Sequence, residues 1–282
     1  MARVAIAQGS DVYDRTRLCL ETLGRPDGDQ MPDAFLKFNT APFQLFGTTQ
    51  ASGHPETVRA VAHYLRAGRT GRLQAGDGPG APDPGKGFRE CGYTQMCAEE
   101  GIELVDLDAD EVEQIDIPGA LSLHRIGIVA SVRACQGLVS IAWMRTHGYT
   151  TISLCMKNLM GVIGPSSDRG TMHVPFPERI TDLVSALRPG LSVIDGTTRL
   201  DEGVSRTPVP LDVTVAGWDI VAVDAVGTAI MGFDPMQIEH IWLAHQRGLG
   251  TADLSEIEIV GRSLGDVQQK YAPIGAGMRT SR

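Results

Sequence analysis

The chain has 282 residues, 42% of them hydrophobic and 21% charged, which is enough for one large globular domain or two smaller ones. Its formal net charge is −9 and its pI is near 5.2, so its surface would repel phosphate backbones and anionic lipids. This composition disfavours nucleic-acid and membrane-surface binders. No apolar stretch reaches the roughly 18 to 20 residues of a spanning helix, and the first residues do not resemble a signal peptide. We therefore expect a soluble, cytoplasmic protein.

Short apolar runs alternate with helical patterns through the first part of the chain. The sequence predicts, in order, a strand at 3–7, a helix from about Asp11, a strand at 35–39, a helix at 54–68, a strand at 72–76, a helix at 86–101 and a strand at 102–108. This alternation is typical of βαβ units, which build a largely parallel sheet.

The second half continues the same rhythm. It predicts a strand at 137–143, helices at 150–164 and 176–190, a strand at 191–196, a segment at 214–232 that turns from extended to helical, a helix at 234–248 and a strand at 257–261. The acidic stretch at 109–120 indicates either a domain boundary or a β-excursion within one domain. We expect a single large α/β domain over residues 1–262, with a mostly parallel sheet and helices on both faces, and a weakly ordered tail over 263–282.

The cysteines are unsuited to a cluster or a disulfide framework. There are five of them, an odd number without CxxC spacing: Cys19, Cys91, Cys97, Cys135 and Cys155. The spacing predicts neither a zinc site nor an iron–sulfur cluster.

The segment at 150–164 is the most unusual, because Lys157 and Asn158 stand among apolar residues. A lysine there loses hydration unless it meets a carboxylate or a ligand anion, and burial lowers its pKa toward values useful for a base. The alternative is an ordinary lysine whose long side chain reaches solvent.

Other polar residues follow predicted strands, where open α/β sheets place their ligand sites. Asp77 lies at the strand end in the loop 76–87, which matches no phosphate-loop pattern and is otherwise typical of a proline-rich surface loop. His147, His173 and Asp195 are candidates for divalent-metal ligands, or for a base with its orienting partners, if folding brings them together. Asp224 is either a helix cap or a buried acid that needs a partner.

The order of these motifs resembles the domain-of-unknown-function family 362. The matching motifs are Lys37-Phe38-Asn39, Thr48 into HPETVRAV, Gly76-Asp77, Arg145-Thr146-His147, Lys157-Asn158-Leu159-Met160-Gly161, His173, Asp195-Gly196, Asp219 to Asp224-Ala225 and Met231-Gly232. The likeness extends over about residues 3–261 and implies an α/β fold with a polar site built from these motifs.

The chain departs from the family pattern at two motif positions. Phe38 replaces proline and Arg145 replaces lysine, which keeps the positive charge but exchanges a titratable amine for a fixed guanidinium fork. Many relatives are joined to ferredoxin-like cysteine clusters, which this chain lacks.

Together these features suggest an enzyme that acts on a small anionic metabolite by general acid/base chemistry. Lys157 would be base or electrostatic stabiliser, His147 and His173 proton carriers or metal ligands, and Asp195 their orienting carboxylate. The expected substrate contacts are Lys37, Asn39, Asp77, Arg145 and Asn158. The sequence does not choose among a lyase, isomerase, cyclase or hydrolase step, and it leaves open a divalent metal cofactor and oligomerisation. The alternatives are a redox or accessory protein and a non-catalytic anion-binding module.

Overall fold

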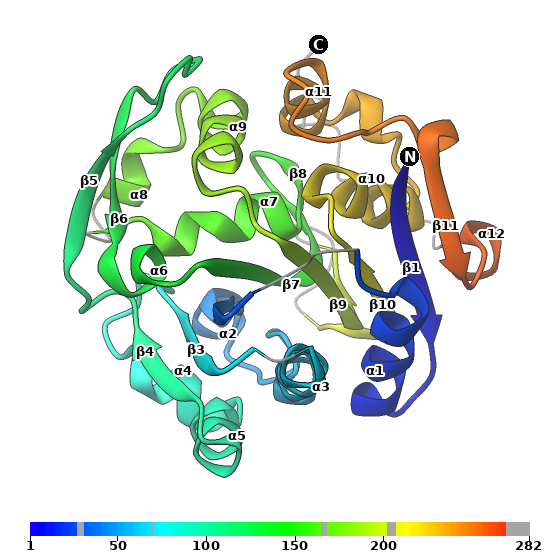
Figure 1. Ribbon diagram of the computed structural model, residues 1–282, viewed down its shortest axis with the longest axis horizontal. Coiled ribbons are helices and arrows are strands. Elements are labelled where there is room, and N and C mark those ends of the chain that lie inside the picture. Colours follow the sequence, from blue (N-terminus) through cyan, green and yellow to red (C-terminus); the bar gives the residue numbers. More distant parts are fainter. Residues whose placement is uncertain (27–30, 69, 165–167, 202–206, 269–282) are drawn as a thin grey trace.

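The computed structural model describes residues 1–26, 31–68, 70–164, 168–201 and 207–268, and in these residues the main sheet has nine strands (Figure 1). The strands of both sheets are β1 (Ala2–Gln8), β2 (Asp33–Lys37), β3 (Arg72–Asp77), β4 (Glu103–Asp106), β5 (Val112–Asp116), β6 (Arg125–Val129), β7 (Gly137–His147), β8 (Thr151–Ser153), β9 (Leu191–Leu200), β10 (Val209–Gly217) and β11 (Ile257–Gly261).

The main sheet is mostly parallel, as predicted. Its order is β11-β1-β10-β9-β7-β2-β3-β4, with β8 added beside β7. Strand β10 runs antiparallel to both neighbours and β8 antiparallel to β7, whereas the other pairs are parallel. The carboxyl ends of β2, β3, β7 and β9 therefore meet at one edge of the sheet.

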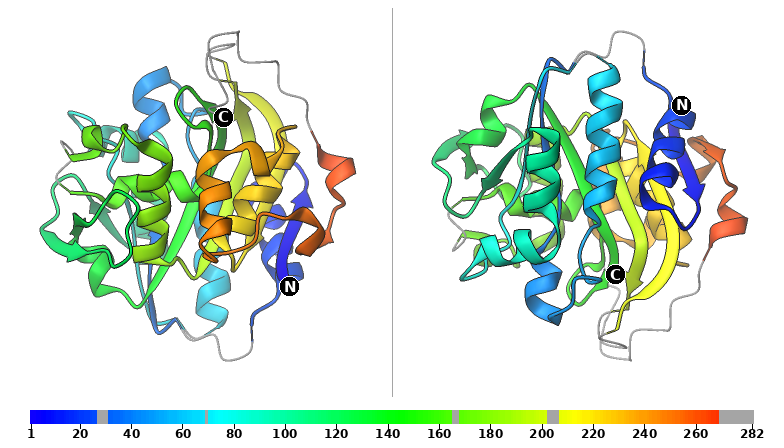
Figure 2. Two further views of the ribbon diagram at one scale, coloured as in Figure 1. Left: turned by 90° about the horizontal axis from the view of Figure 1, so that it is seen from above. Right: turned by 90° about the horizontal axis from the view of Figure 1, so that it is seen from below.

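Helices cover both faces of this sheet (Figure 2). They are α1 (Val12–Leu23), α2 (Ala41–Phe46), α3 (Pro55–Ala67), α4 (Pro84–Glu90), α5 (Tyr93–Glu100), α6 (Ala130–Ala134), α7 (Cys155–Asn158), α8 (Asp168–Thr171), α9 (Phe176–Leu187), α10 (Ile220–Ile230), α11 (Glu239–Gln246) and α12 (Leu264–Val267), with short 3₁₀ turns η1 (Leu159–Val162), η2 (Pro235–Gln237) and η3 (Leu254–Glu256). Within the part of the chain described, no helix has the length and apolar character that a membrane crossing requires.

Each face has its own hydrophobic core. On one face α1, α3 and α5 bury residues such as Leu20, Val61 and Met96 against the sheet. On the other, α7, α9, α10 and α11 bury residues such as Met156 and Val223. The two cores follow from strand alternation, since successive side chains point to opposite faces.

The acidic stretch after residue 109 is a β-excursion and not a domain boundary. Strands β5 and β6 form a separate antiparallel pair. Ile126 and Ile128 of β6 are buried in the same core as α9 and α10, so the hairpin belongs to the single α/β domain.

Two predicted helices are wrong in detail. The segment at 150–164 begins as strand β8, which pairs with the end of β7, and turns helical only at Cys155. Short apolar runs do not distinguish strand from helix, and the long β7 offered a free edge to pair with. The helix at 86–101 is divided at Gly92, whose φ of 83° belongs to the left-handed region. Of the predicted tail, 264–267 form α12, and 269–282 lie outside the described residues.

Candidate functional site

A cavity of about 140 Å³ opens at the carboxyl ends of β2, β3 and β7. It is lined by Lys37, Asn39, Ala41, Asp77, Gly78, Pro79, Arg145, Ser153, Lys157, Asn158, Met160, Gly161 and Arg169. All five predicted substrate contacts and the predicted base Lys157 therefore border one cavity.

The sheet topology places the cavity there. Strand β2 lies between β3 and β7. The chain passes from β2 to β3 through α3 on one face, and from β7 to β9 through α9 on the opposite face. The two connections leave in opposite directions, so the crevice between β2 and β7 is a topological switch point, where open α/β sheets bind their ligands.

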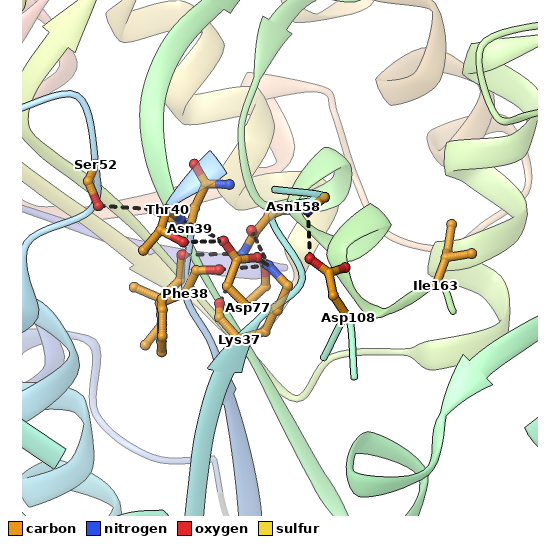
Figure 3. Close-up of polar contacts among 12 residues, drawn as sticks. Lys37, Phe38, Asn39, Thr40, Ser52, Asp77, Asp108, Asn158 and Ile163 are labelled. Atoms are coloured by element: carbon orange, nitrogen blue, oxygen red, sulfur yellow. Dashed lines mark hydrogen bonds and ion pairs between the residues drawn. The ribbon is translucent and has the colours of Figure 1, made fainter. Parts of the chain in front are cut away.

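Lys37 is the centre of a buried polar cluster at this edge (Figure 3). Its side chain is fully buried, and Nζ donates to Asp77 Oδ1 at 2.7 Å, Asn158 Oδ1 at 2.9 Å and the Phe38 carbonyl at 2.6 Å. The second oxygen of Asp77 accepts from the amide and hydroxyl of Thr40 at 2.6 and 2.9 Å. Burial lowers the pKa of Lys37, and the adjacent Asp77 carboxylate opposes that shift.

This geometry changes the expected role of Lys37. An ammonium group has three donors, and all three of Lys37 are already used inside the protein. Asn158 completes the cluster, since its Nδ2 donates to the Lys37 carbonyl at 3.0 Å and to Ser140 Oγ at 3.1 Å. Lys37 and Asn158 thus join β2, β3, β7 and α7, and Lys37 contributes charge to the cavity rather than a free donor.

Arg169 is a cavity residue that the sequence reasoning missed. Its Nη1 donates to Asp108 Oδ1 at 2.6 Å and its Nε to the Ile163 carbonyl at 3.0 Å. Its Nη2 is buried and has no hydrogen-bond partner among the residues that the structure describes. The only sequence signal was its place in the polar stretch 164–173, where Ser166 and Ser167 lie outside the described residues.

The two predicted histidines lie beside the cavity and not in it. His147 and His173 surround Phe176, with ring centroids 6.2 and 4.8 Å from the Phe176 ring, and Tyr149 packs against both. These four side chains form an aromatic cluster. Lys157 connects it to the cavity, since Lys157 lines the cavity and its Nζ lies 5.5 Å from the Phe176 centroid.

The surroundings of His147 favour its neutral form. Burial lowers its pKa, and the charges of Lys157 and Arg145 lower it further. Its Nδ1 accepts from the Tyr149 amide at 3.2 Å, which assigns the proton of the neutral ring to Nε2.

Asp195 does not orient either histidine, contrary to the sequence expectation. One oxygen accepts from the His54 amide at 2.5 Å and the Thr57 hydroxyl at 3.0 Å, and the other from the amide and hydroxyl of Thr197 at 2.8 and 2.6 Å. Along β9 it shares a face with Val193 in the core beneath α1 and α3, whereas α7 packs on the opposite face. Strand alternation therefore directs Asp195 away from Lys157.

The proposed three-ligand metal set is consequently not assembled. Across the described ranges, no group of three His, Cys, Asp or Glu side chains could hold a metal ion. The cysteines are free, and burial raises the pKa of the Cys19 thiol to about 12.

The fold is similar to the lactate racemase apoprotein from Thermoanaerobacterium thermosaccharolyticum, with 11% identity, a TM-score of 0.44, and coverage of 80% of this chain and 57% of that one. It is also similar to a Thermotoga maritima protein, with 9% identity, a TM-score of 0.36, and coverage of 85% of this chain and 60% of that one. The chain thus spans less than two thirds of either structure's length.

The sequence matches no curated protein. The sequence model of the family described as "Domain of unknown function (DUF362)" matches residues 35–229, which include every residue lining the cavity. Because this match extends over more than half of the chain, the protein belongs to the DUF362 family.

Proposed function

We propose that the protein is an enzyme that acts on a small anionic metabolite, whose charged group binds in the cavity between β2 and β7. The observation that carries this proposal is the charge around the cavity. Its described lining includes the cations Lys37, Arg145, Lys157 and Arg169 and a single carboxylate, Asp77, in a protein whose net charge is −9. Gathered cations in an acidic protein favour an anionic ligand.

The unpartnered Nη2 of Arg169 supports the same proposal. A buried donor without an acceptor lowers the folding stability by about 1 to 3 kcal/mol. An anion in the cavity would supply the acceptor, and the Asp108 and Ile163 contacts of Arg169 already fix the direction of its fork.

The cavity volume limits the size of the bound group. An apolar cavity of roughly 150 Å³ accommodates benzene, so about 140 Å³ accommodates roughly six non-hydrogen atoms. This fits a phosphate or sulfate group, or the carboxylate end of a two- or three-carbon acid. A larger substrate would extend out of the cavity.

In this proposal Lys157 is the general base or the electrostatic stabiliser. It is half-buried at the cavity wall and touches the aromatic cluster, so it can face a bound anion from one side while Arg145 and Arg169 hold the negative charge. In the cluster of His147, Tyr149, His173 and Phe176, His173 is exposed and His147 is half-buried, so solvent reaches His173 more readily.

Sulfate is a suitable probe, because it stays a dianion near neutral pH. We expect calorimetric titration to detect sulfate binding to the wild-type protein, and Lys157→Met to weaken it about tenfold or more, since a charge-assisted hydrogen bond contributes about 1.5 to 3 kcal/mol. The matched control is Lys86→Met, an exposed lysine of α4 whose loss should leave the affinity unchanged. Equal affinities for all three proteins would contradict the proposed site.

A further inference from the structure

Asp224 is a fully buried carboxylate in the apolar helix α10. It does not cap its own helix, a role that Asp219 fills by accepting from the amides of Val221 and Ala222. Instead, Oδ1 of Asp224 accepts from the Cys155 amide at 2.8 Å, and Oδ2 from the Met156 amide at 2.9 Å. These are the first two amides of α7, so Asp224 caps a different helix.

Helix α7 depends on such outside contacts. It has only four residues, and a helix of one turn has little stability of its own. The first four amides of any helix lack partners within it, and Asp224 satisfies two of them. The next two residues are Lys157 and Asn158, which line the cavity.

The packing of α10 fits this role. Gly227 lies one turn beyond Asp224 on the same helix face, and a Cβ there would lie 2.5 Å from Ile194 Cδ1 and 3.0 Å from Leu154 Cδ1. The absence of a side chain at Gly227 lets α10 approach Leu154, the residue before α7. The carboxylate of Asp224 can therefore reach the start of α7.

Burying the Asp224 carboxylate costs desolvation free energy. Burial raises the pKa of Asp224 to about 7, even though its two amide hydrogen bonds favour the charged form. A leucine of similar size would avoid this desolvation. The two hydrogen bonds of the carboxylate, however, hold the start of α7 in place.

We propose that Asp224 is a positioning residue, which holds α7 so that Lys157 and Asn158 face the cavity. This inference rests on the proposed anion site, because it assigns Asp224 a role in building that site. It predicts that anion affinity depends on the acceptors at position 224 and not on the overall stability of the protein.

The test is a graded series measured by calorimetric titration with sulfate at pH 8. Asp224→Asn keeps the shape and one acceptor, but turns an NH₂ group toward the other amide. Asp224→Leu removes both acceptors. We expect the sulfate Kd to rise about tenfold in Asp224→Asn, as for the loss of one charged hydrogen bond, and further in Asp224→Leu.

The matched control is Asp182→Asn. Asp182 is also fully buried, and it accepts from the amides of Leu121, Ser122 and Leu123, which are not among the cavity residues. This variant should lose stability while its sulfate Kd stays that of the wild type. If Asp224→Asn and Asp182→Asn both bind sulfate as the wild type does, Asp224 does not position the site.

Hydrogen exchange separates this inference from the proposed function and does not require the variants to bind sulfate. If the wild-type protein does not bind sulfate, the proposed anion site fails. The positioning role is then judged by the amides of 155–158, which should exchange faster in Asp224→Asn than in Asp182→Asn, and equal rates overturn it. If the Asp224 variants do not fold, sulfate should slow exchange at 155–158 in the wild type, and unchanged exchange there overturns the inference.

Discussion

Gly161 shows how closely single residues fit around the polar cluster. A Cβ at Gly161 would lie 2.5 Å from Lys37 Cε and 2.9 Å from Asp77 Oδ1, so any side chain would push the pair apart. We expect Gly161→Ala to cost about 1 to 3 kcal/mol of unfolding free energy by overpacking, and to weaken sulfate binding. Urea unfolding and calorimetry would measure both. Gly170→Ala is the control, since nothing lies within 4 Å of a Cβ at Gly170, and a loss as large there would contradict the steric explanation.

The Lys37–Asp77 pair gives a second prediction at the residue scale. Both side chains are almost fully buried, so removing one partner leaves the other charged and unpaired. Lys37→Met and Asp77→Asn should each cost about 3 to 5 kcal/mol of unfolding free energy, and the double variant less than their sum. Strictly additive losses in urea unfolding would mean that the two groups do not act as a pair.

At the scale of elements, Asp195 joins strand β9 to the start of helix α3. Its carboxylate accepts from the amide of His54, the N-cap residue of α3, and from the Thr57 hydroxyl in the first turn, and Arg15 lies 4.0 Å away. We expect Asp195→Asn to lower the unfolding free energy by about 2 to 4 kcal/mol, because it removes charged hydrogen bonds in a buried position. Sulfate affinity should not change. Normal stability combined with lost sulfate binding would instead support the catalytic role expected from the sequence.

Long periodic elements could be predicted from the sequence, whereas the segment between β7 and η1 could not. Helices α3 and α9 were predicted because each is a long periodic segment that buries one face and leaves the other more accessible. Strand β9 was predicted from a short apolar run, and its first six residues are buried on both faces of the sheet. Thr151–Ser153 could not be recognised as a strand, because its conformation depends on pairing with Arg145–His147. The apolar pattern of 150–164 agrees equally well with a buried helix.

At the scale of the whole molecule, buried ionisable groups determine how stability varies with pH. Burial lowers the pKa of His240 to about 3, and it also lowers the pKa of His147. Below about pH 6.5 these two histidines bind protons in the unfolded chain but stay neutral in the native protein. A fall in pH therefore favours unfolding. Asp224 acts in the opposite direction: its native pKa of about 7 lies above its ordinary value of 3.8, so its contribution stabilises the native protein at low pH and is lost as the pH rises toward 7.

Among these three groups the two histidines outnumber the one aspartate, so we expect their combined contribution to the unfolding free energy to rise between about pH 4.5 and 6.5. Each unbalanced proton contributes about 1.4 kcal/mol per pH unit. His240→Leu should flatten this slope, and Asp224→Asn should steepen it. Urea unfolding at several pH values measures the slopes, and identical slopes for the three proteins would contradict the assignment of these groups.

The sequence by itself determined the α/β class, the mostly parallel sheet and the membership of the family. The observed strand order confirms the sheet, and the family match over 35–229 confirms the membership. These depend on local periodicity and on motifs that are continuous in the chain. Only the tertiary structure decided which polar residues meet: it brought Lys37, Asp77 and Lys157 to one cavity, added Arg169, and turned Asp195 to the other face of the sheet. The physical reason is that strand order and the side on which each helix crosses are set by packing the whole chain, and no local pattern contains them.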